Sequence, residues 1–321
     1  MTNKKNILVT GGAGFIGSNL VEALLNDERV GTVKVLDNLS NGHRRNIEPF
    51  LDRKDFEFIE GDIREYNTCM NACKDVDLIS HQAALGSVPR SISAPLTTNA
   101  VNITGTLNIF TVAKDLGIKK IVYACSSSTY GDSTAIPKRE DVIGTPISPY
   151  AVTKLVNELY AKVYGSLYDI NFIGLRYFNV FGPKQDPYGA YAAVIPLFMK
   201  AVLENKTPTI FGDGLQSRDF TFVQNVVQAN LQALFTENES AFNEVYNIAF
   251  GERTTLLEVY DIIKNIAGSS LEPNFGPARQ GDVKHSHADI SKAKNYLGYN
   301  PQTNIREGLE IAFKWYAQFR P

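Results

Sequence analysis

A glycine-rich run, Gly11-Gly12-Ala13-Gly14-Phe15-Ile16-Gly17, constrains the fold of this chain more than any other feature because of the segments that flank it. Residues 6–10 before it are mostly apolar and predict a strand, and residues 18–25 after it carry apolar side chains at helical spacing. A glycine turn between a strand and a helix lets the backbone approach a diphosphate, and the helix N-terminus offers that charge free N–H groups. The run therefore predicts a phosphate-binding turn at the start of an α/β fold.

A second strand, predicted over 33–37, ends in an acidic side chain that indicates the ligand. Asp37 follows Gly17 by 20 residues, a spacing at which a carboxylate accepts hydrogen bonds from the adenosine ribose of a dinucleotide. The same carboxylate would repel the 2′-phosphate of NADP. Arg44 and Arg45 lie just downstream and could bind that phosphate, but we interpret them as solvated cations at the start of a helix. NAD is therefore the predicted cofactor.

Composition excludes several classes of protein. The chain has 321 residues, of which 44% are hydrophobic and 21% charged, as in a soluble globular protein. Its net charge of −2, without a basic stripe, argues against nucleic acid as a partner. Three cysteines cannot close a disulfide framework, and Cys69 and Cys73 have no second pair that would suggest zinc, so no metal is predicted. No stretch approaches the roughly 20 apolar residues that span a bilayer. We expect a soluble, cytoplasmic protein with no membrane partner.

Strand and helix patterns alternate through the first half of the chain. Further strands are predicted over 56–59, 77–83, 120–124 and 171–176, and helices over 99–116 and 149–168. Repeated β-α-β units with apolar strands predict an α/β fold, a Rossmann-type doubly wound parallel sheet. Ligands of such sheets bind outside the C-terminal ends of the strands.

The pattern changes at about residue 183, where loops rich in Pro, Gly and aromatic residues separate shorter elements. We therefore predict an NAD-binding Rossmann domain over 1–182 and a smaller C-terminal substrate-binding α/β lobe over 183–321. Later segments, about 215–250, are expected to return to the first domain, because 222–234 and 245–248 are typical of its sheet and flank. Pro196 predicts the start of a helix or a kink.

The predicted catalytic residues are Tyr150, Lys154 and Ser126. Tyr150 and Lys154 are four residues apart near the start of a predicted helix and so share one face. A free tyrosine, with a pKa near ~10, is a poor base at neutral pH. A nearby ammonium and a positively charged nicotinamide favour the phenolate and make it usable. Ser126 lies at the end of the strand predicted over 120–124, where its hydroxyl can hold the substrate oxygen.

These features together resemble the extended short-chain dehydrogenase/reductase superfamily, specifically its NAD-dependent nucleotide-sugar epimerases and dehydratases. The resemblance covers essentially the whole chain and lies closest to the UDP-N-acetylglucosamine 4-epimerases, which are themselves similar to UDP-glucose 4-epimerases. It rests on seven motifs in the family's order, namely residues 11–17, 37–42, 61–63, 81–84, 126–128, the Tyr150/Lys154 pair and 176–183.

The resemblance implies a cofactor site that is larger than the glycine turn. Asp62 and Ile63 would contact adenine, Ala83 and Ala84 the diphosphate and ribose, Asn102 a phosphate, and Tyr177 the nicotinamide pocket. The full set predicted to bind NAD is Gly11, Gly14, Phe15, Ile16, Gly17, Asp37, Asn38, Ser40, Gly42, Asp62, Ile63, Gln82, Ala83, Ala84, Asn102, Tyr150, Lys154 and Tyr177. NAD would stay bound and be regenerated in each turnover.

The resemblance also separates epimerases from 4,6-dehydratases. Both oxidise C4 of a hexose, but a dehydratase then needs an acid and a base to eliminate water across C5 and C6. In that family an Asp-Glu pair follows the catalytic hydroxyl residue. Here Ser127 and Ser128 occupy those positions, and neutral hydroxyls cannot readily supply the elimination. We therefore expect epimerisation, in which the keto sugar rotates and takes the hydride back on its other face.

The C-terminal lobe carries features similar to those that hold UDP in sugar 4-epimerases. Asn179, Arg218 and Arg279 would bind phosphates, and residues 192–194 resemble the loop over the uracil. The full set predicted to bind substrate is Gly86, Ser87, Ser126, Ser127, Ser128, Tyr150, Asn179, Ala193, Val194, Arg218, Arg279, Asp282 and Ser286.

Two positions bear on the sugar. In the family, the residue seven after the second arginine flanks the C2 substituent; tyrosine there restricts the enzyme to glucose and galactose, whereas Ser286 here would admit an N-acetyl group. Residues 86–91 resemble a loop of bacterial epimerases that act on N-acetylhexosamines. UDP-N-acetylglucosamine is thus favoured, with UDP-glucose or dual activity as the alternative. UDP-uronates, dehydration and a non-catalytic nucleotide-binding regulator are less favoured readings.

The family also implies a homodimer. Two helices, expected over 99–116 and 149–168, would pack against their symmetry mates as a four-helix bundle. Their apolar side chains Leu107, Phe110, Val156 and Leu159 motivate this, although packing on the parent sheet would explain some of them.

Overall fold

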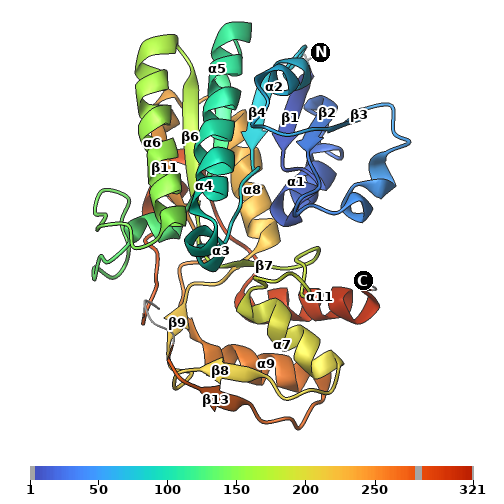
Figure 1. Cartoon of the computed structure of the whole chain (residues 1–321), viewed down its shortest axis with the longest axis vertical. Helices are drawn as coiled ribbons and strands as arrows, with labels where there is room; N and C mark the ends of the chain where they lie inside the picture. The colour runs from blue at the N-terminus through green and yellow to red at the C-terminus, as the bar shows by residue number, and fades with distance from the viewer. Residues whose placement is uncertain (1–3, 279–283, 320–321) are drawn as a thin grey trace.

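The architecture is that of a computed structural model, which describes residues 4–278 and 284–319. Seven parallel strands form one sheet in the order β11-β6-β5-β4-β1-β2-β3, and the order reverses between β1 and β4 (Figure 1). The strands are β1 (Lys5–Thr10), β2 (Val30–Asp37), β3 (Phe56–Glu60), β4 (Leu78–His81), β5 (Lys120–Ser126), β6 (Asn171–Tyr177) and β11 (Glu244–Ile248). The predicted Rossmann-type sheet is confirmed, and its switch point between β1 and β4 is where such folds bind ligands.

Helices cover both faces of this sheet because its strands are apolar on both sides. On one face lie α1 (Phe15–Leu24) and α8 (Val223–Phe235), which share a core with the sheet. On the other lie α2 (Tyr66–Ala72), α5 (Thr106–Leu116) and α6 (Pro149–Tyr168), with a second core. Helix α6 begins where predicted, because Ser148 caps it and Pro149 occupies its first turn.

The helix predicted over 99–116 begins earlier in the structure and is not one regular α-helix. The segment is helical already from α4 (Pro95–Asn99), continues as a π-helical turn over Ala100–Gly105, and becomes α5 only at Thr106. Pro95 starts α4 earlier than the apolar spacing suggested. A π-turn holds an extra residue in the helix, which the 3.6-residue pattern does not reveal, and such turns are frequent at functional sites.

The C-terminal elements pack around a third core below the sheet (Figure 1). Its helices are α7 (Val194–Leu203), α9 (Leu256–Ala267) and α11 (Ile305–Gln318). Short strand pairs accompany them, namely β7 (Val180–Phe181) with β10 (Thr221–Phe222), β9 (Ser217–Arg218) with β12 (Thr254–Thr255), and β8 (Thr209–Phe211) with β13 (Asn274–Gly276). The described residues also form the short α-helices α3 (Val88–Ser93) and α10 (Ser291–Leu297). Pro196 lies in the first turn of α7, which agrees with a helix start.

The segments expected to return to the sheet do so, since β11 pairs with β6 and α8 packs against β4, β5 and β6. The three cysteines are buried and unpaired. Over 4–278 and 284–319, no cluster of acidic, His or Cys side chains could hold a metal ion. In the same residues no helix is long and apolar enough to cross a membrane.

Candidate active site

A cavity of about 1120 Å³ opens at the C-terminal ends of the parallel strands and reaches the C-terminal elements. The end of β2, the loops after β1 and β4, the end of β5 and the end of β6 all contribute to its wall. Most of the residues predicted to bind cofactor or substrate line this one cavity. They are Gly11, Gly14, Phe15, Ile16, Gly17, Asp37, Asn38, Ser40, Gly42, Asp62, Ile63, Gln82, Ala83, Ala84, Gly86, Ser87, Ser126, Ser127, Ser128, Tyr150, Lys154, Tyr177, Asn179, Ala193, Arg218 and Ser286.

The glycine turn has the close backbone contacts that a diphosphate site requires. A Cβ on Gly17 would lie 2.1 Å from the carbonyl oxygen of Gly11, and a Cβ on Gly11 would lie 2.7 Å from the nitrogen of Ala83. Gly11 also has φ of +69°, a conformation that favours glycine. The N-cap of α1 is Gly14, and no side chain caps the helix there. The N–H groups of the first turn therefore remain available to an anion.

Asp37, predicted to bind the ribose, lines the cavity and is held by the backbone. Its carboxylate accepts hydrogen bonds from the N–H groups of Ala13, at 3.0 Å, and Leu39, at 2.8 Å. Burial raises the pKa of this carboxyl, and the two hydrogen bonds oppose that shift. The two arginines that could have accommodated a 2′-phosphate face aromatic rings instead: Arg44 lies over Phe58 and Arg45 over Phe319. The site therefore fits NAD better than NADP.

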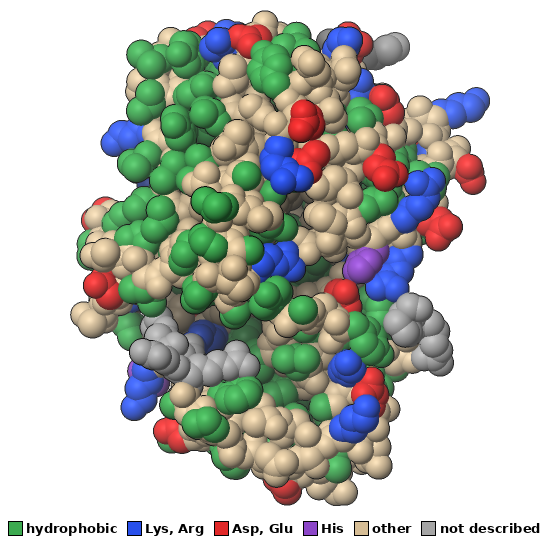
Figure 2. All heavy atoms as spheres, viewed as in Figure 1, with side chains coloured by type: hydrophobic (Ala, Val, Ile, Leu, Met, Phe, Trp, Pro, Cys, Tyr) green, Lys and Arg blue, Asp and Glu red, His purple; other side chains and the backbone are tan. Residues whose placement is uncertain are grey.

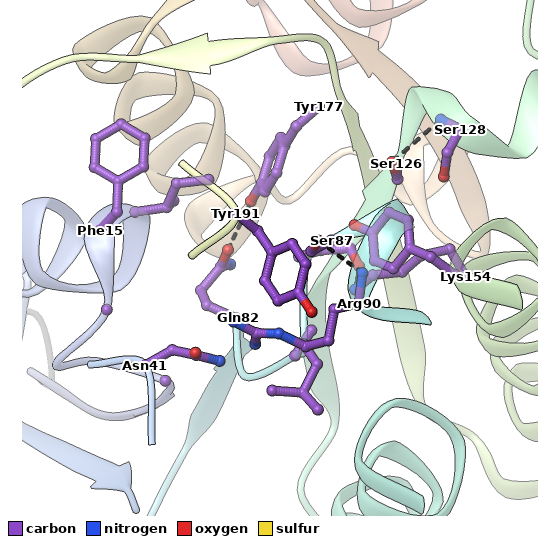
Figure 3. Close-up of a pocket in the computed structure, with 18 of the residues that line it drawn as sticks. Phe15, Asn41, Gln82, Ser87, Arg90, Ser126, Ser128, Lys154, Tyr177 and Tyr191 are labelled. Carbon is purple, nitrogen blue, oxygen red and sulfur yellow. Dashed lines mark hydrogen bonds between the residues drawn. The ribbon is translucent and has the colours of Figure 1, made fainter. Parts of the chain in front are cut away.

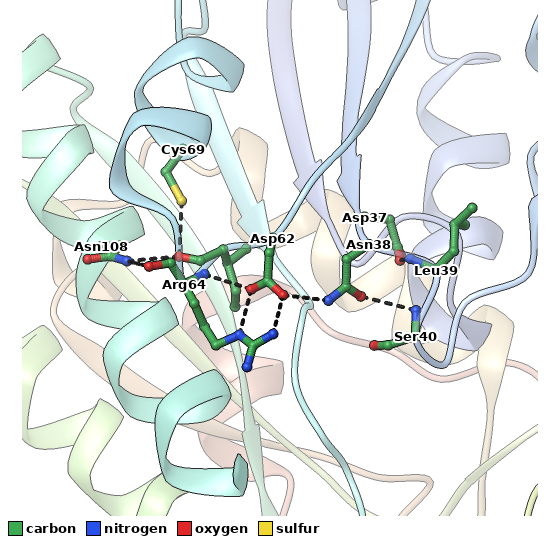
Figure 4. A network of polar contacts seen from close by, with 9 residues as sticks. Asp37, Asn38, Leu39, Ser40, Asp62, Arg64, Cys69 and Asn108 are labelled. Carbon is green, nitrogen blue, oxygen red and sulfur yellow. Dashed lines mark hydrogen bonds and ion pairs between the residues drawn. The ribbon is translucent and has the colours of Figure 1, made fainter.

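The part of the cavity that is predicted to hold adenine contains a polar network (Figure 4). Arg64 donates to the Asp62 carboxylate through Nε, Nη2 and its backbone N–H, and the Asn38 amide donates to it at 2.8 Å. These donors lower the pKa of Asp62 to about 2. Each carboxylate oxygen already has two donors, so we expect any contact with adenine to come from the backbone here.

The three predicted catalytic residues lie together at the C-terminal end of the central strand β5. Lys154 is 4% exposed and donates to the carbonyl of Ala124 at 2.8 Å, two residues before Ser126 at the end of β5. Burial lowers the pKa of Lys154 to about 8. Its Nζ lies 6.0 Å from the centre of the Tyr150 ring.

The pKa of Tyr150 differs from the expectation for a ready base. Burial of the phenol raises it, and a hydrogen bond with the Ser126 side chain opposes that rise. The Lys154 ammonium donates to a backbone carbonyl and lies 6.0 Å from the Tyr150 ring centre, so it acts on the phenol through its charge. The positive nicotinamide of a bound cofactor would add a second charge that favours the phenolate.

The substrate side of the cavity contains a side chain without a hydrogen-bond partner. The Ser128 hydroxyl oxygen is buried, lines the cavity and has no partner among the described residues. A buried polar atom of this kind costs free energy unless a ligand pairs with it. Ser286 lies in the same wall, where its N–H donates to the carbonyl of Ser217.

Comparison with known proteins identifies the family. The sequence model of a family described as "NAD dependent epimerase/dehydratase family" matches residues 7–249. The chain belongs to this family. As a member it uses NAD, and the glycine turn, the free N–H groups of α1 and Asp37 are the residues that would hold this cofactor.

Three relatives extend the likeness along nearly the whole chain. The chain is 38% identical over 304 residues to the UDP-glucose 4-epimerase of Mycolicibacterium smegmatis, with 94% of this chain and 95% of that protein covered. A UDP-N-acetylglucosamine 4-epimerase from Methanobrevibacter ruminantium M1, solved with UDP-N-acetylmuramic acid, is 38% identical with a TM-score of 0.92 and covers 98% and 99% of the two chains. A UDP-glucuronic acid 4-epimerase from Bacillus cereus, solved with its uronate and NAD, is 34% identical with a TM-score of 0.90 and the same coverage.

Two residues predicted to bind ligand in this epimerase/dehydratase family member do not line the cavity. Asn102 is fully buried, and its amide contacts the backbone of Leu85 and the hydroxyl of Thr153. Val194 is the first residue of α7 and is not part of the cavity wall either. The ligand contacts expected of these two residues stay predictions. Arg279 and Asp282 lie outside the described residues.

Other cavity residues were not assigned a role by the sequence analysis, although Arg90 lies within its loop 86–91. Arg90 from α3 and Tyr191 from the segment before α7 lie against each other, with the guanidinium 5.1 Å from the ring centre (Figure 3). Asp186 lines the cavity and pairs with His43, which follows the ribose loop, at 3.1 Å. No local signal marks these pairs, because about a hundred residues or more separate their members.

Proposed function

We propose that this chain is an NAD-dependent 4-epimerase of UDP-N-acetylhexosamines, which interconverts UDP-N-acetylglucosamine and UDP-N-acetylgalactosamine. The relatives above are UDP-sugar 4-epimerases, and the chain shares their family, length and fold; it is a UDP-sugar 4-epimerase and thus an isomerase. The preference for an N-acetylated sugar is the finer step. The observation that carries it is Ser286, a small side chain in the cavity wall at the position predicted to flank C2.

In the proposed reaction the residues of the chain move one proton and hold one oxygen. Tyr150 takes the proton of the C4 hydroxyl while Ser126 holds that oxygen. Bound NAD supplies the acceptor for the C4 hydride and returns the same hydride. The resulting 4-keto sugar turns within the cavity, and Tyr150 gives its proton back to the C4 oxygen after the opposite face is reduced. Lys154 keeps a positive charge near the phenol and the ribose throughout.

The nucleotide end of the substrate is assigned to the C-terminal elements. Arg218 lines the cavity and offers a guanidinium, whose fork geometry suits the oxygens of a diphosphate. Asn179, between β6 and β7, also lines the cavity. So does Ala193, which the resemblance assigns to the loop over the uracil. UDP is therefore expected to lie between β9 and the start of α7.

A panel of UDP-sugars tests the proposal. We expect the purified enzyme to turn over UDP-N-acetylglucosamine faster than UDP-glucose, and either faster than UDP-glucuronate. Faster turnover of UDP-glucose would favour the alternative, a UDP-glucose/UDP-galactose 4-epimerase. Preference for the uronate would overturn the proposal, and NAD binding without turnover of any sugar would indicate a non-catalytic nucleotide binder.

We further propose that the enzyme is a homodimer through α5 and α6. Leu159 and Val163 on α6 are 58% and 52% exposed, and hydrophobic side chains gather over this helix in Figure 2. Leu107 and Val156, also named from sequence, are half-buried. Phe110 must be removed from the predicted interface, because it is fully buried against Tyr123 and other aromatic rings of the parent sheet.

Charges placed on this face should separate the protomers. We expect sedimentation at micromolar concentration to show a dimer for the wild type and a monomer for Leu159→Glu/Val163→Glu, because two carboxylates would be desolvated in the interface. Leu203→Glu is the matched control, since Leu203 is similarly exposed but lies on α7. A monomeric wild type would contradict the proposal.

A further inference from the structure

We propose that His81, as the neutral tautomer with its proton on Nε2, is a positioning residue that links the cofactor-binding strand ends to the catalytic helix. His81 is the last residue of β4, is 4% exposed and does not line the cavity. The proposal uses the catalytic role assigned above to Tyr150, but its structural part stands on hydrogen bonds alone.

One side of His81 faces the cofactor. Its Nδ1 lies 2.7 Å from the hydroxyl of Thr10, the last residue of β1 before the glycine turn. The same hydroxyl accepts a hydrogen bond from the N–H of Ala83 at 3.3 Å. Ala83 in turn packs against Gly11 so closely that no Cβ fits between them. Nδ1 of His81 is thus tied to both loops that approach the dinucleotide.

The other side of His81 faces the catalytic helix. Its Nε2 lies 2.9 Å from the hydroxyl of Thr106, which donates at 2.7 Å to the carbonyl of Asn102 in the π-helical turn. The Asn102 amide donates at 3.1 Å to the hydroxyl of Thr153. That hydroxyl donates at 2.7 Å to the backbone carbonyl of Tyr150. The contacts therefore end on the residue proposed as the base.

Counting hydrogens assigns the tautomer. With the single hydroxyl hydrogen of Thr106 on the carbonyl of Asn102, this hydroxyl accepts from Nε2–H of His81 and, at 3.3 Å, from the side-chain amide of Asn157. A neutral imidazole has only one N–H, so Nδ1 is bare and accepts from Thr10. The orientation of the Asn102 amide is fixed as well, because its oxygen accepts from the N–H of Leu85 at 2.8 Å.

Every bond in this chain consequently donates in one direction, from Ala83 through Thr10 and His81 toward Tyr150. Such a chain is satisfied only as a whole, and hydrogen bonds aligned in this way strengthen one another. Burial lowers the pKa of His81 to about 3, and the nearby Lys154 ammonium lowers it further. The imidazole stays neutral at working pH, so the direction of the chain does not change when other groups titrate.

Removal of one hydroxyl at a time tests the link. In Thr106→Val the Nε2–H of His81 and the side-chain amide of Asn157 lose their acceptor, and in Thr10→Val the bare Nδ1 loses its donor, with little change in volume. We expect kcat of each folded holoenzyme to fall about tenfold, because the contacts that position the backbone of Tyr150 are interrupted; the unpaired polar group also lowers stability. The double variant should lose no more kcat than the worse single variant, since both cut one chain. Thr111→Val, on the same helix but outside the chain, is the control.

The tautomer is tested separately by nitrogen NMR of the histidine-labelled holoenzyme. The chain has 4 histidines, so variants of the other three assign the signal of His81. We expect one protonated nitrogen, Nε2, and one bare nitrogen, Nδ1, unchanged from pH 5 to pH 8. A proton on Nδ1, a doubly protonated ring, or unchanged kcat in Thr106→Val would overturn the proposal. If no UDP-sugar is turned over, the proposed function fails, while the NMR result still decides the tautomer.

Discussion

Replacement of Tyr150 by Phe abolishes turnover, in our expectation, and leaves the binding of NAD and UDP-sugar nearly intact. The variant keeps the ring that fills the cavity wall but removes the oxygen that exchanges the proton with C4. Positioned proton transfer is worth roughly 10²–10⁴-fold, so kcat should fall by at least about 100-fold. Stopped assays with the best sugar of the panel measure the rate, and calorimetry with UDP-sugar measures binding.

The matched control is Tyr164→Phe, in the same helix but nearly three turns beyond Lys154. The Tyr164 hydroxyl contacts only Thr111 among the described residues, so its removal should leave kcat unchanged. Retention of more than about a tenth of the wild-type rate by Tyr150→Phe would exclude Tyr150 as the base. Lys154→Met should lose both turnover and NAD affinity, because the ammonium is expected to reach the nicotinamide ribose as well as to support the phenol.

The proposed role of Tyr150 as base depends on the bound cofactor. In the protein alone, burial raises the pKa of the phenol, and the Lys154 ammonium donates to the carbonyl of Ala124. The positive nicotinamide of bound NAD would favour the phenolate, so we expect the phenol to lose its proton more readily in the holoenzyme.

The sequence predicted those parts of the fold and site that are encoded by contiguous residues. The glycine turn, the strand that ends in Asp37 and the Tyr150/Lys154 pair each occupy one short segment whose spacing is set by a single strand or helix. The predicted strands lie in the sheet as expected, and α6 has the predicted bounds. Local periodicity and capping are sufficient for features of this kind.

Features that depend on contacts between distant segments were not predictable. Asn102 falls inside an apparent amphipathic helix, and only the π-helical turn directs its amide toward Leu85 and Thr153. The contact between Arg90 and Tyr191 joins residues from opposite sides of the cavity, and no alternation or motif relates them. In each case the three-dimensional position, rather than the residue type, determines the role.

The side chain at position 286 should decide which sugar the enzyme accepts. The backbone here is held on both sides: the N–H of Ser286 donates to Ser217, His285 forms a strand bridge to the same residue, and Ala288 is bridged to Lys138. We therefore expect a larger side chain to extend into the cavity that Ser286 lines. In Ser286→Tyr the ring would occupy the space proposed for an N-acetyl group at C2.

We expect Ser286→Tyr to lower kcat/KM for UDP-N-acetylglucosamine by about 5- to 150-fold, the equivalent of the roughly 1–3 kcal/mol that overpacking costs. Activity on UDP-glucose should survive or rise, since its C2 hydroxyl leaves room for the ring. Ser286→Ala separates volume from hydrogen bonding and should keep both activities. The ratio of the two kcat/KM values is the measured quantity, because a general loss of folded enzyme cancels from it. Equal losses on both sugars would show that position 286 does not face C2, and the proposed N-acetyl preference would lose its main support.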